Sequence, residues 1–257
     1  MKKRKHKTLS KKDSHIKNCE LMLHKNAQAQ QQTTKYNFTI HDLKSVRPIN
    51  QPQTTMFKSF IQGNHIVADG SAGTGKTYAA IFLALNELLQ KDSSFQKIII
   101  VRSAVASRDL GHLPGSADEK MEIYELPYID MVNDMLGSSK GYSAMKEAGR
   151  IQFMPTSFVR GLTWDNAIVV VDEVQNLTFH EINSVMTRLG SGSTVMLCGD
   201  YIQSDLNKSR SDSTGIGKFV RVVQRIDDFD YIKFTTDDIV RSAFVKKWIQ
   251  AIESDDE

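Results

Sequence analysis

The stretch GSAGTGKT, residues 70–77, decides the reading of this sequence because it matches the pattern G-x-x-x-x-G-K-[ST]. It follows the short apolar run HIVAD at 65–69 and precedes a helical pattern at 76–90. A glycine-rich loop between a buried strand and a helix turns successive backbone N–H groups inward, so that they cradle phosphate oxygens at the helix N-terminus. The predicted phosphate-binding residues are Gly70, Ser71, Ala72, Gly73, Thr74, Gly75, Lys76 and Thr77.

Two side chains of this loop and two acids farther along the chain predict the chemistry. Lys76 can reach the β- and γ-phosphates of a nucleotide, and the Thr77 hydroxyl is a typical ligand of Mg²⁺. The run VVVDE at 169–173 delivers two acids at the end of an apolar strand. Asp172 would hold the magnesium ion, whereas Glu173 would orient and deprotonate the attacking water. A plain strand–helix turn and a pair of turn acids are the structural alternatives.

Apolar runs alternate with helical patterns along the chain. Strands are predicted at 65–69, 97–101, 151–154, 167–171, 194–198 and 231–234, and helices at 76–90, 126–136, 178–189 and from 235 through 252. Several of these runs are apolar at successive positions, as in strands buried on both faces. The order therefore predicts an α/β fold with a mainly parallel sheet, whose functional residues gather beyond the carboxyl ends of the strands.

A third polar position follows the run TVMLC at 194–198. Gln203 comes after Gly199 and Asp200 and is expected at the same sheet edge as Lys76 and Asp172. An amide there could sense the γ-phosphate by hydrogen bonding, although a loop glutamine without such a role is the alternative. Thr178 is a predicted N-cap of the 178–189 helix, with Glu181 at its third position.

Composition excludes several classes of protein. The 257 residues are 40% apolar and 25% charged, close to a soluble globular average. No apolar run approaches the ~20 residues of a membrane span, and the basic N-terminus lacks the apolar stretch of a secretory signal. Two distant cysteines, Cys19 and Cys198, provide neither a disulfide framework nor a zinc cluster. We therefore expect a cytoplasmic protein that does not enter membranes.

Charge divides the chain into two parts. Residues 1–35 hold ten of the 33 Lys and Arg residues but only two of the 30 Asp and Glu residues, so this segment carries +8 and the remaining chain −5. We predict a basic, disordered arm at 1–35 and a single folded domain at 36–257. The arm could bind nucleic acid by releasing counterions from phosphates, or it could be a solubilising tail.

The motifs in their order resemble the PhoH family. GSAGTGKT, then VDEVQN at 171–176 and TRLGSGSTVMLCGDYIQSDL at 187–206, are similar to this family of P-loop ATPases, which are related to the RecA-like motor domain of superfamily one helicases. Segments 48–53, 98–115, 159–163 and 236–241 also resemble the family, so the match covers about 47–249. The resemblance implies a RecA-like three-layer sandwich that uses ATP and Mg²⁺.

The resemblance also implies roles for individual residues. Gln53 is similar to the glutamine that reads the adenine edge in related helicases, and Gln175 completes a D-E-x-Q signature with the two acids. Gln203 occupies the γ-phosphate-sensing position. Arg188 and Arg241 are candidate γ-phosphate arginines, with helix-surface salt bridges as the alternative.

The resemblance implies ATP hydrolysis coupled to binding or unwinding of single-stranded RNA or DNA. Because a helicase closes two RecA-like surfaces on ATP, one domain per chain implies a homo-oligomer, for which a hexameric ring is the usual form. Arg241 could then act in its own chain or at a neighbour's site. The alternative function is a nucleotide-dependent assembly or binding protein with weak ATPase activity and no unwinding, and a small-molecule kinase is disfavoured.

Overall fold

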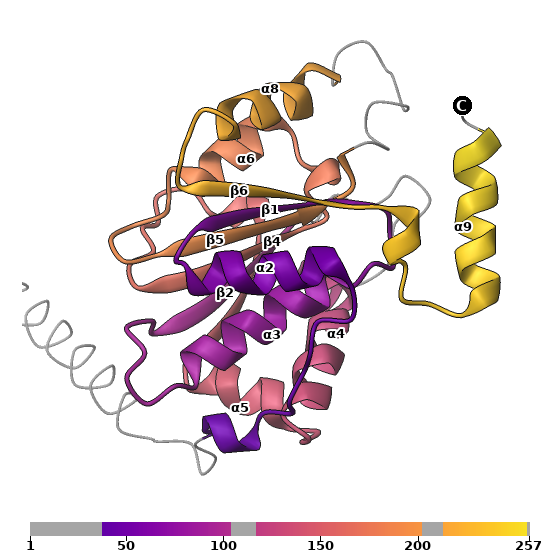
Figure 1. The fold of residues 1–257 in the computed structure, drawn as a ribbon. Helices are drawn as coiled ribbons and strands as arrows, with labels where there is room; N and C mark the ends of the chain where they lie inside the picture. The colour runs from indigo at the N-terminus through magenta and orange to yellow at the C-terminus, as the bar shows by residue number, and fades with distance from the viewer. Residues whose placement is uncertain (1–37, 104–116, 202–212, 256–257) are drawn as a thin grey trace, which may run out of the picture. The chain divides into compact units, whose positions relative to one another are not determined.

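Six parallel strands form one sheet in the computed structural model of the protein, in the order β3-β2-β4-β5-β1-β6 (Figure 1). The structure describes residues 38–103, 117–201 and 213–255. The strands are β1 (His65–Gly70), β2 (Lys97–Arg102), β3 (Ile151–Pro155), β4 (Ala167–Asp172), β5 (Thr194–Gly199) and β6 (Phe229–Phe234). Because β5 lies between β1 and β4, one strand separates the glycine-rich loop from the Asp172–Glu173 pair.

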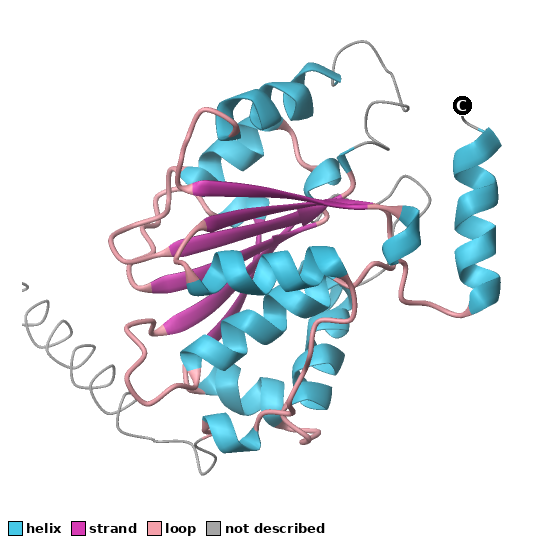
Figure 2. Ribbon diagram, in the orientation of Figure 1, coloured by secondary structure: helices cyan, strands magenta, loops and turns pink. Residues whose placement is uncertain are grey.

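Helices cover both faces of the sheet, as Figure 2 shows by element type. The α-helices are α2 (Gln51–Ile61), α3 (Lys76–Leu88), α4 (Ala117–Met135), α5 (Gly141–Glu147), α6 (Phe179–Met186), α8 (Ser213–Val223) and α9 (Ala243–Asp255). Short 3₁₀ helices are η1 (Ile40–Asp42), η2 (Thr156–Phe158), η3 (Val174–Asn176) and η4 (Thr236–Asp238). Helices α2, α3, α4 and α5 pack on one face, and α6 and α8 pack on the other.

Strand residues alternate between these two cores. In β4, Ile168 and Val170 pack with α3 and α4, whereas Val169 and Val171 face α6 and α8. Every residue of β4 and β5 is buried, which explains why their sequences are apolar at successive positions. The predicted fold class, a RecA-like three-layer sandwich with a parallel sheet, is confirmed.

The predicted start of α6 is also confirmed. Thr178 caps the helix, because its Oγ1 accepts a hydrogen bond from the backbone N–H of Glu181 at 3.3 Å. The Glu181 carboxylate in turn accepts from the backbone N–H of Thr178 at 2.9 Å. This reciprocal capping satisfies two backbone donors at the helix N-terminus.

Several features differ from the sequence prediction. The last helix, α9, begins at Ala243 and not at residue 235, because η4 follows β6 first. Helix α4 begins at Ala117, not near residue 126, and continues through Pro127, because the neighbouring Glu125 and Tyr128 are anchored by buried hydrogen bonds. Such tertiary contacts outweigh the hydrogen bond that proline removes. Helices α2, α5 and α8 were not predicted.

Some predictions fall outside the described residues. Gln203 and the basic arm at 1–35 belong to the parts of the chain that the structure does not describe, so the role of Gln203 and the domain boundary at residue 36 stay predictions. Among the described helices, none is long and apolar enough to cross a membrane.

Candidate nucleotide-binding site

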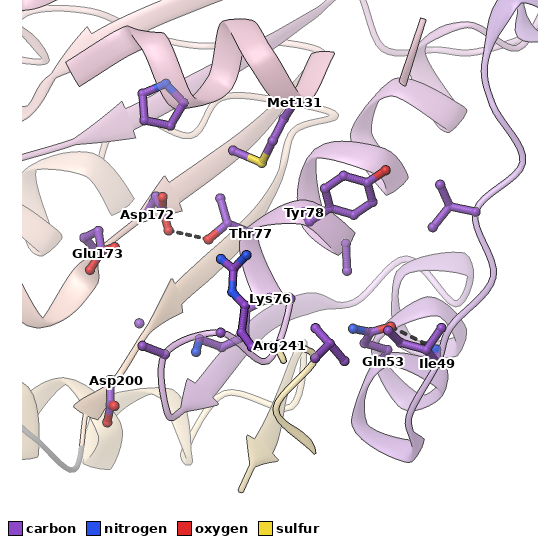
Figure 3. A pocket seen from close by; sticks show the side chains of 18 of the residues that line it. Ile49, Gln53, Lys76, Thr77, Tyr78, Met131, Asp172, Glu173, Asp200 and Arg241 are labelled. Atoms are coloured by element: carbon purple, nitrogen blue, oxygen red, sulfur yellow. Dashed lines mark hydrogen bonds between the residues drawn. The ribbon is translucent and has the colours of Figure 1, made fainter. Parts of the chain in front are cut away.

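A cleft of about 790 Å³ opens at the carboxyl ends of the central strands (Figure 3). The glycine-rich loop, the ends of β2, β4 and β5, helix α2 and the segment after η4 all contribute to its lining. Of the residues predicted to form the site, the cleft is lined by Gln53, Ala72, Gly73, Gly75, Lys76, Thr77, Asp172, Glu173, Gln175 and Arg241. The cleft therefore lies at the edge of the sheet where functional residues of parallel α/β folds gather.

Gly70 ends β1 in a conformation that only glycine adopts without strain, with φ +140°. A Cβ atom at this position would stand 1.9 Å from the carbonyl oxygen of Phe234 on the adjacent strand β6. The absence of a side chain thus lets the loop leave β1 while β6 stays paired with it. This close approach places the start of the loop beside the segment that follows β6.

Lys76 is buried at the first position of α3 and points back into its own loop. Its Nζ donates to the carbonyl oxygens of Gly70 at 2.5 Å and Ser71 at 2.8 Å, and lies 3.3 Å from Thr74 Oγ1. Burial lowers the pKa of Lys76, although the nearby carboxylates of Asp200, Asp172 and Asp69 oppose this shift. Phosphate binding therefore requires this ammonium to exchange carbonyl oxygens for phosphate oxygens.

The Thr77 hydroxyl joins the loop to the acid at the end of β4. Thr77 Oγ1 donates to Asp172 Oδ1 at 2.6 Å, as the dashed line in Figure 3 marks. The other carboxylate oxygen of Asp172 accepts from the Tyr128 hydroxyl of α4 at 2.8 Å. Burial and the charge of Asp172 raise the pKa of Tyr128, so the phenol stays protonated and donates. Both oxygens of Asp172 are thereby held in fixed positions.

Hydroxyl and carboxylate oxygens are the ligands that Mg²⁺ prefers, and at phosphate sites it usually takes one or two carboxylates besides the phosphates. Thr77 and Asp172 fit this pattern, since their oxygens already lie next to each other at the cleft. Within the described ranges, no group of three or more His, Cys, Asp or Glu residues forms a separate metal cage. The donor set suits a magnesium ion that shares a bound nucleotide's phosphates.

Glu173 adopts a left-handed backbone conformation, with φ +53° and ψ +46°. Such a conformation is costly for a residue other than glycine and often marks a functional site. Its carboxylate accepts a hydrogen bond from Gln175 Nε2 at 2.5 Å, and Gln175 Oε1 accepts from the backbone N–H of Asp200 at 3.1 Å. Gln175 thus links the acid pair to the loop that begins after β5.

Gln53 lies against the glycine-rich loop. Its Nε2 donates to the carbonyl oxygen of Thr74 at 3.1 Å, and its Oε1 accepts from the backbone N–H of Ile49 at 3.0 Å. One donor of the amide therefore braces the glycine-rich loop, and one acceptor holds the backbone just before α2. The amide retains a second N–H and a second lone pair for a ligand.

The two predicted arginines lie at different ends of the sheet. Arg241 extends into the cleft of its own chain (Figure 3), and its Cγ stands 3.1 Å from the point that a Cβ on Gly73 would occupy. The preceding Val240 donates its backbone N–H to the Gly73 carbonyl at 2.9 Å. Arg188 instead donates to the Leu162 carbonyl at 3.3 Å, near the amino end of β4. The structure therefore does not bring Arg188 to its own cleft.

Arg102 and Tyr128 are two of the residues of the cleft region that sequence reasoning missed. Arg102 follows the buried strand β2 and lies 5.9 Å from the ring centroid of Tyr124. Its position directly after KIIIV was the available signal, because the carboxyl end of a parallel strand belongs to the functional edge. Tyr128 offered no such signal, since its contact with Asp172 joins residues 44 positions apart.

Comparison with known proteins decides the family. The family model described as "PhoH-like protein" matches residues 45–253, which is most of the chain. The chain belongs to the PhoH-like family. It is 36% identical to the PhoH-like protein of Bacillus subtilis over 81% of its own length and 64% of that protein's length. It is 33% identical to Protein PhoH of Escherichia coli K12, over 82% of this chain and 60% of that protein.

The PhoH-like region of this chain thus spans somewhat less than two thirds of those relatives. Among solved structures, the large terminase of a thermophilic bacteriophage is similar with a TM-score of 0.48 and 13% identity, over 79% of this chain and 50% of that one. The SWI2/SNF2 ATPase core of Sulfolobus solfataricus gives a TM-score of 0.41 and 13% identity, over 76% of this chain and 46% of that one.

Proposed function

We propose that this PhoH-like protein binds and hydrolyses ATP and couples hydrolysis to the binding or unwinding of single-stranded RNA or DNA. The observation that carries the proposal is the hydrogen bond between Thr77 and Asp172. It joins the phosphate-binding loop and the acid pair in one cleft, with Glu173 on the adjoining turn. An isolated glycine-rich turn would not need this pairing.

Binding of the nucleotide rests on the loop and on two cations. The backbone N–H groups of residues 72–77, at the N-terminus of α3, would bind the phosphates. The Lys76 ammonium, which now contacts the carbonyl oxygens of its own loop, would bind the β- and γ-phosphate oxygens instead. Arg241, which lies across Gly73, places a second positive charge beside the same oxygens. Gln53 keeps its contact with Thr74 and offers its remaining amide groups to the base.

Thr77 and Asp172 would hold Mg²⁺, which when bound neutralises charge on the β- and γ-phosphate oxygens. Glu173 orients the attacking water and takes its proton on a carboxylate oxygen. Gln175 holds this carboxylate in place and simultaneously contacts the start of the loop after β5, where Gln203 is expected to sense the γ-phosphate.

We further propose that the chain works as a homo-oligomer, with a hexameric ring as its form. A single RecA-like domain supplies one of the two surfaces that close around ATP in a helicase. Arg188 lies near the amino end of β4, away from its own cleft, and would act at the cleft of a neighbour. Arg241 serves its own cleft.

The direct test is ATP turnover by the purified protein with and without single-stranded RNA and DNA, with Lys76→Ala as the matched control. We expect turnover that depends on Lys76 and rises when a polynucleotide is added. Turnover no higher than that of Lys76→Ala would refute the hydrolase. Lys76-dependent turnover that neither RNA nor DNA stimulates would favour the nucleotide-dependent assembly protein.

A further inference from the structure

Helix α9 exposes an aromatic face that its own chain leaves uncovered. Phe244, Trp248 and Ile252, spaced four residues apart on one side of the helix, are 73%, 61% and 49% exposed. The rings of Phe244 and Trp248 lie 6.3 Å apart, so they form one patch. Among the described elements, α9 packs chiefly against η4, and it stands apart from the helices that cover the sheet (Figure 1).

An apolar groove runs along α2 from the cleft, with which it shares Val46 and Phe57, to the amino end of the sheet at Gly63 and Thr194. It has a volume of about 650 Å³ and runs between η1, α2 and α3. Its apolar lining includes Phe57, Phe60, Phe82 and Ile61, and Ile61 is 80% exposed. The groove lies near the start of β1, because α2 ends at Ile61 and β1 begins at His65. Helix α9 instead begins beyond the carboxyl end of β6 and lies outside the groove of its own chain (Figure 1).

The two surfaces match in charge as well as in apolar character. Lys44 lines the groove, but its ammonium is paired with Asp134 at 2.5 Å. Lys247 is exposed beside Trp248 on α9, whereas Glu87 lines the groove at the end of α3. Neither residue forms an ion pair within the described residues. One basic side chain beside the aromatic patch and one acid beside the groove would bring opposite charges together when the patch fills the groove.

We propose that α9 of one chain docks in the η1–α2–α3 groove of a second copy of the same chain. This inference rests on the homo-oligomer proposed above and names the contact that builds it. Because α9 and the groove are separate surfaces of each copy, every added copy keeps one free helix or one free groove, and such a head-to-tail contact builds a ring where the rotation closes and an open filament where it does not. Arg241 lies two residues before α9, so a docked α9 would directly adjoin the segment that contacts the glycine-rich loop.

The area available sets the strength of a single contact. Aromatic side chains bury about 150–250 Å² each, so the exposed fractions of Phe244 and Trp248 leave roughly 200–330 Å² of aromatic surface. A stable interface usually buries about 800 Å² per partner. One docked helix therefore gives a weak contact, and assembly should depend on protein concentration and on closure of the ring.

The test uses two variants that break opposite halves of the contact, with molar mass measured by light scattering across a concentration series. Trp248→Glu removes the helix anchor and Ile61→Glu places a charge in the groove. Each variant alone should need at least about thirtyfold more protein to assemble, the effect typical of removing a central aromatic anchor. Ile226→Glu, at another exposed isoleucine outside both surfaces, should assemble like the wild type.

The decisive measurement is the molar mass of a mixture of the two variants. A Trp248→Glu chain keeps its groove and an Ile61→Glu chain keeps its helix, so a 1:1 mixture should form heterodimers and stop there. Lys247→Glu and Glu87→Lys should each weaken assembly when introduced alone. If assembly returns when both are combined in one chain, these two residues lie in the interface.

Other outcomes overturn the proposal at different points. A monomeric wild type would refute the homo-oligomer, while ATP turnover would still report on the hydrolase independently. A wild-type oligomer that neither variant weakens would refute this docking alone. Normal assembly of Ile61→Glu with weakened assembly of Trp248→Glu would show that α9 covers another surface, such as a second α9. Circular dichroism spectra that match the wild-type spectrum would show that both variants are folded.

Discussion

Replacing Tyr128 by Phe removes one hydroxyl from a buried position and leaves the ring that packs there. That hydroxyl donates at 2.8 Å to Asp172, and both residues are buried. A hydrogen bond to a charged group contributes about 1.5–3 kcal/mol, so we expect the free energy of unfolding to fall by about 2 kcal/mol. For a domain of this size that corresponds to a melting temperature about 4–8 °C lower.

The same substitution should affect magnesium use, because Asp172 loses the partner that fixes one of its oxygens. Removing a group that orients a metal ligand typically costs 10–100-fold in metal affinity or activity. We expect Tyr128→Phe to need about tenfold more Mg²⁺ for half-maximal ATP turnover. Melting is followed by differential scanning calorimetry, and turnover is measured in a magnesium titration at constant ATP.

A matched control lies on the neighbouring helix α5. The hydroxyl of Tyr142 donates to the buried carboxylate of Glu125 at 2.5 Å, and Tyr142 is not among the residues that line the cleft. Tyr142→Phe should therefore lower the melting temperature while leaving the magnesium titration unchanged. An identical magnesium requirement in Tyr128→Phe and the wild type would refute the positioning role of Tyr128, whatever happens to stability.

Three further changes probe the proposed mechanism. Glu173→Gln keeps the size of the side chain but removes the base, so ATP should still bind while hydrolysis slows by about a hundredfold or more in a steady-state assay. Arg241→Ala should abolish hydrolysis while ATP stays bound; mixing it with Lys76→Ala under subunit exchange should restore nothing, and recovered turnover would place Arg241 at a neighbour's cleft. Deleting residues 1–35 should flatten the salt dependence of single-strand binding by about 0.7 in log–log slope for each phosphate that the arm no longer neutralises, and an unchanged slope would leave the arm without a binding role.

The sheet and most of the cleft were predictable from sequence because both depend on local patterns. Buried parallel strands are apolar at successive positions, and residues directly after them share one edge, so Lys76, Asp172 and Glu173 could be placed together without coordinates. The capping pair Thr178 and Glu181 was predictable for the same reason, since its spacing is fixed by one helical turn.

What sequence could not supply depends on distant contacts. The start of α4 was placed too late because Pro127 is a strong local signal, whereas the hydrogen bonds that hold this helix come from Asp172 and Tyr142. The position of Arg188 was equally inaccessible. Its sequence neighbourhood resembles a family motif, but the turn after α6 carries it toward the amino end of β4, away from the phosphate-binding loop.

Gly70 limits which sequences this fold tolerates. Any side chain there would collide with the backbone of Phe234 and push β6 away from β1. The strand that would be displaced leads directly into η4, Arg241 and α9. In a saturation-mutagenesis screen, substitutions of Gly70 should therefore have the same effects as substitutions that disrupt the C-terminal segment, even though Gly70 belongs to the phosphate-binding loop. A second-site suppressor would then have to relocate the β6 backbone, because no change of side chain at Phe234 removes a clash with its carbonyl oxygen.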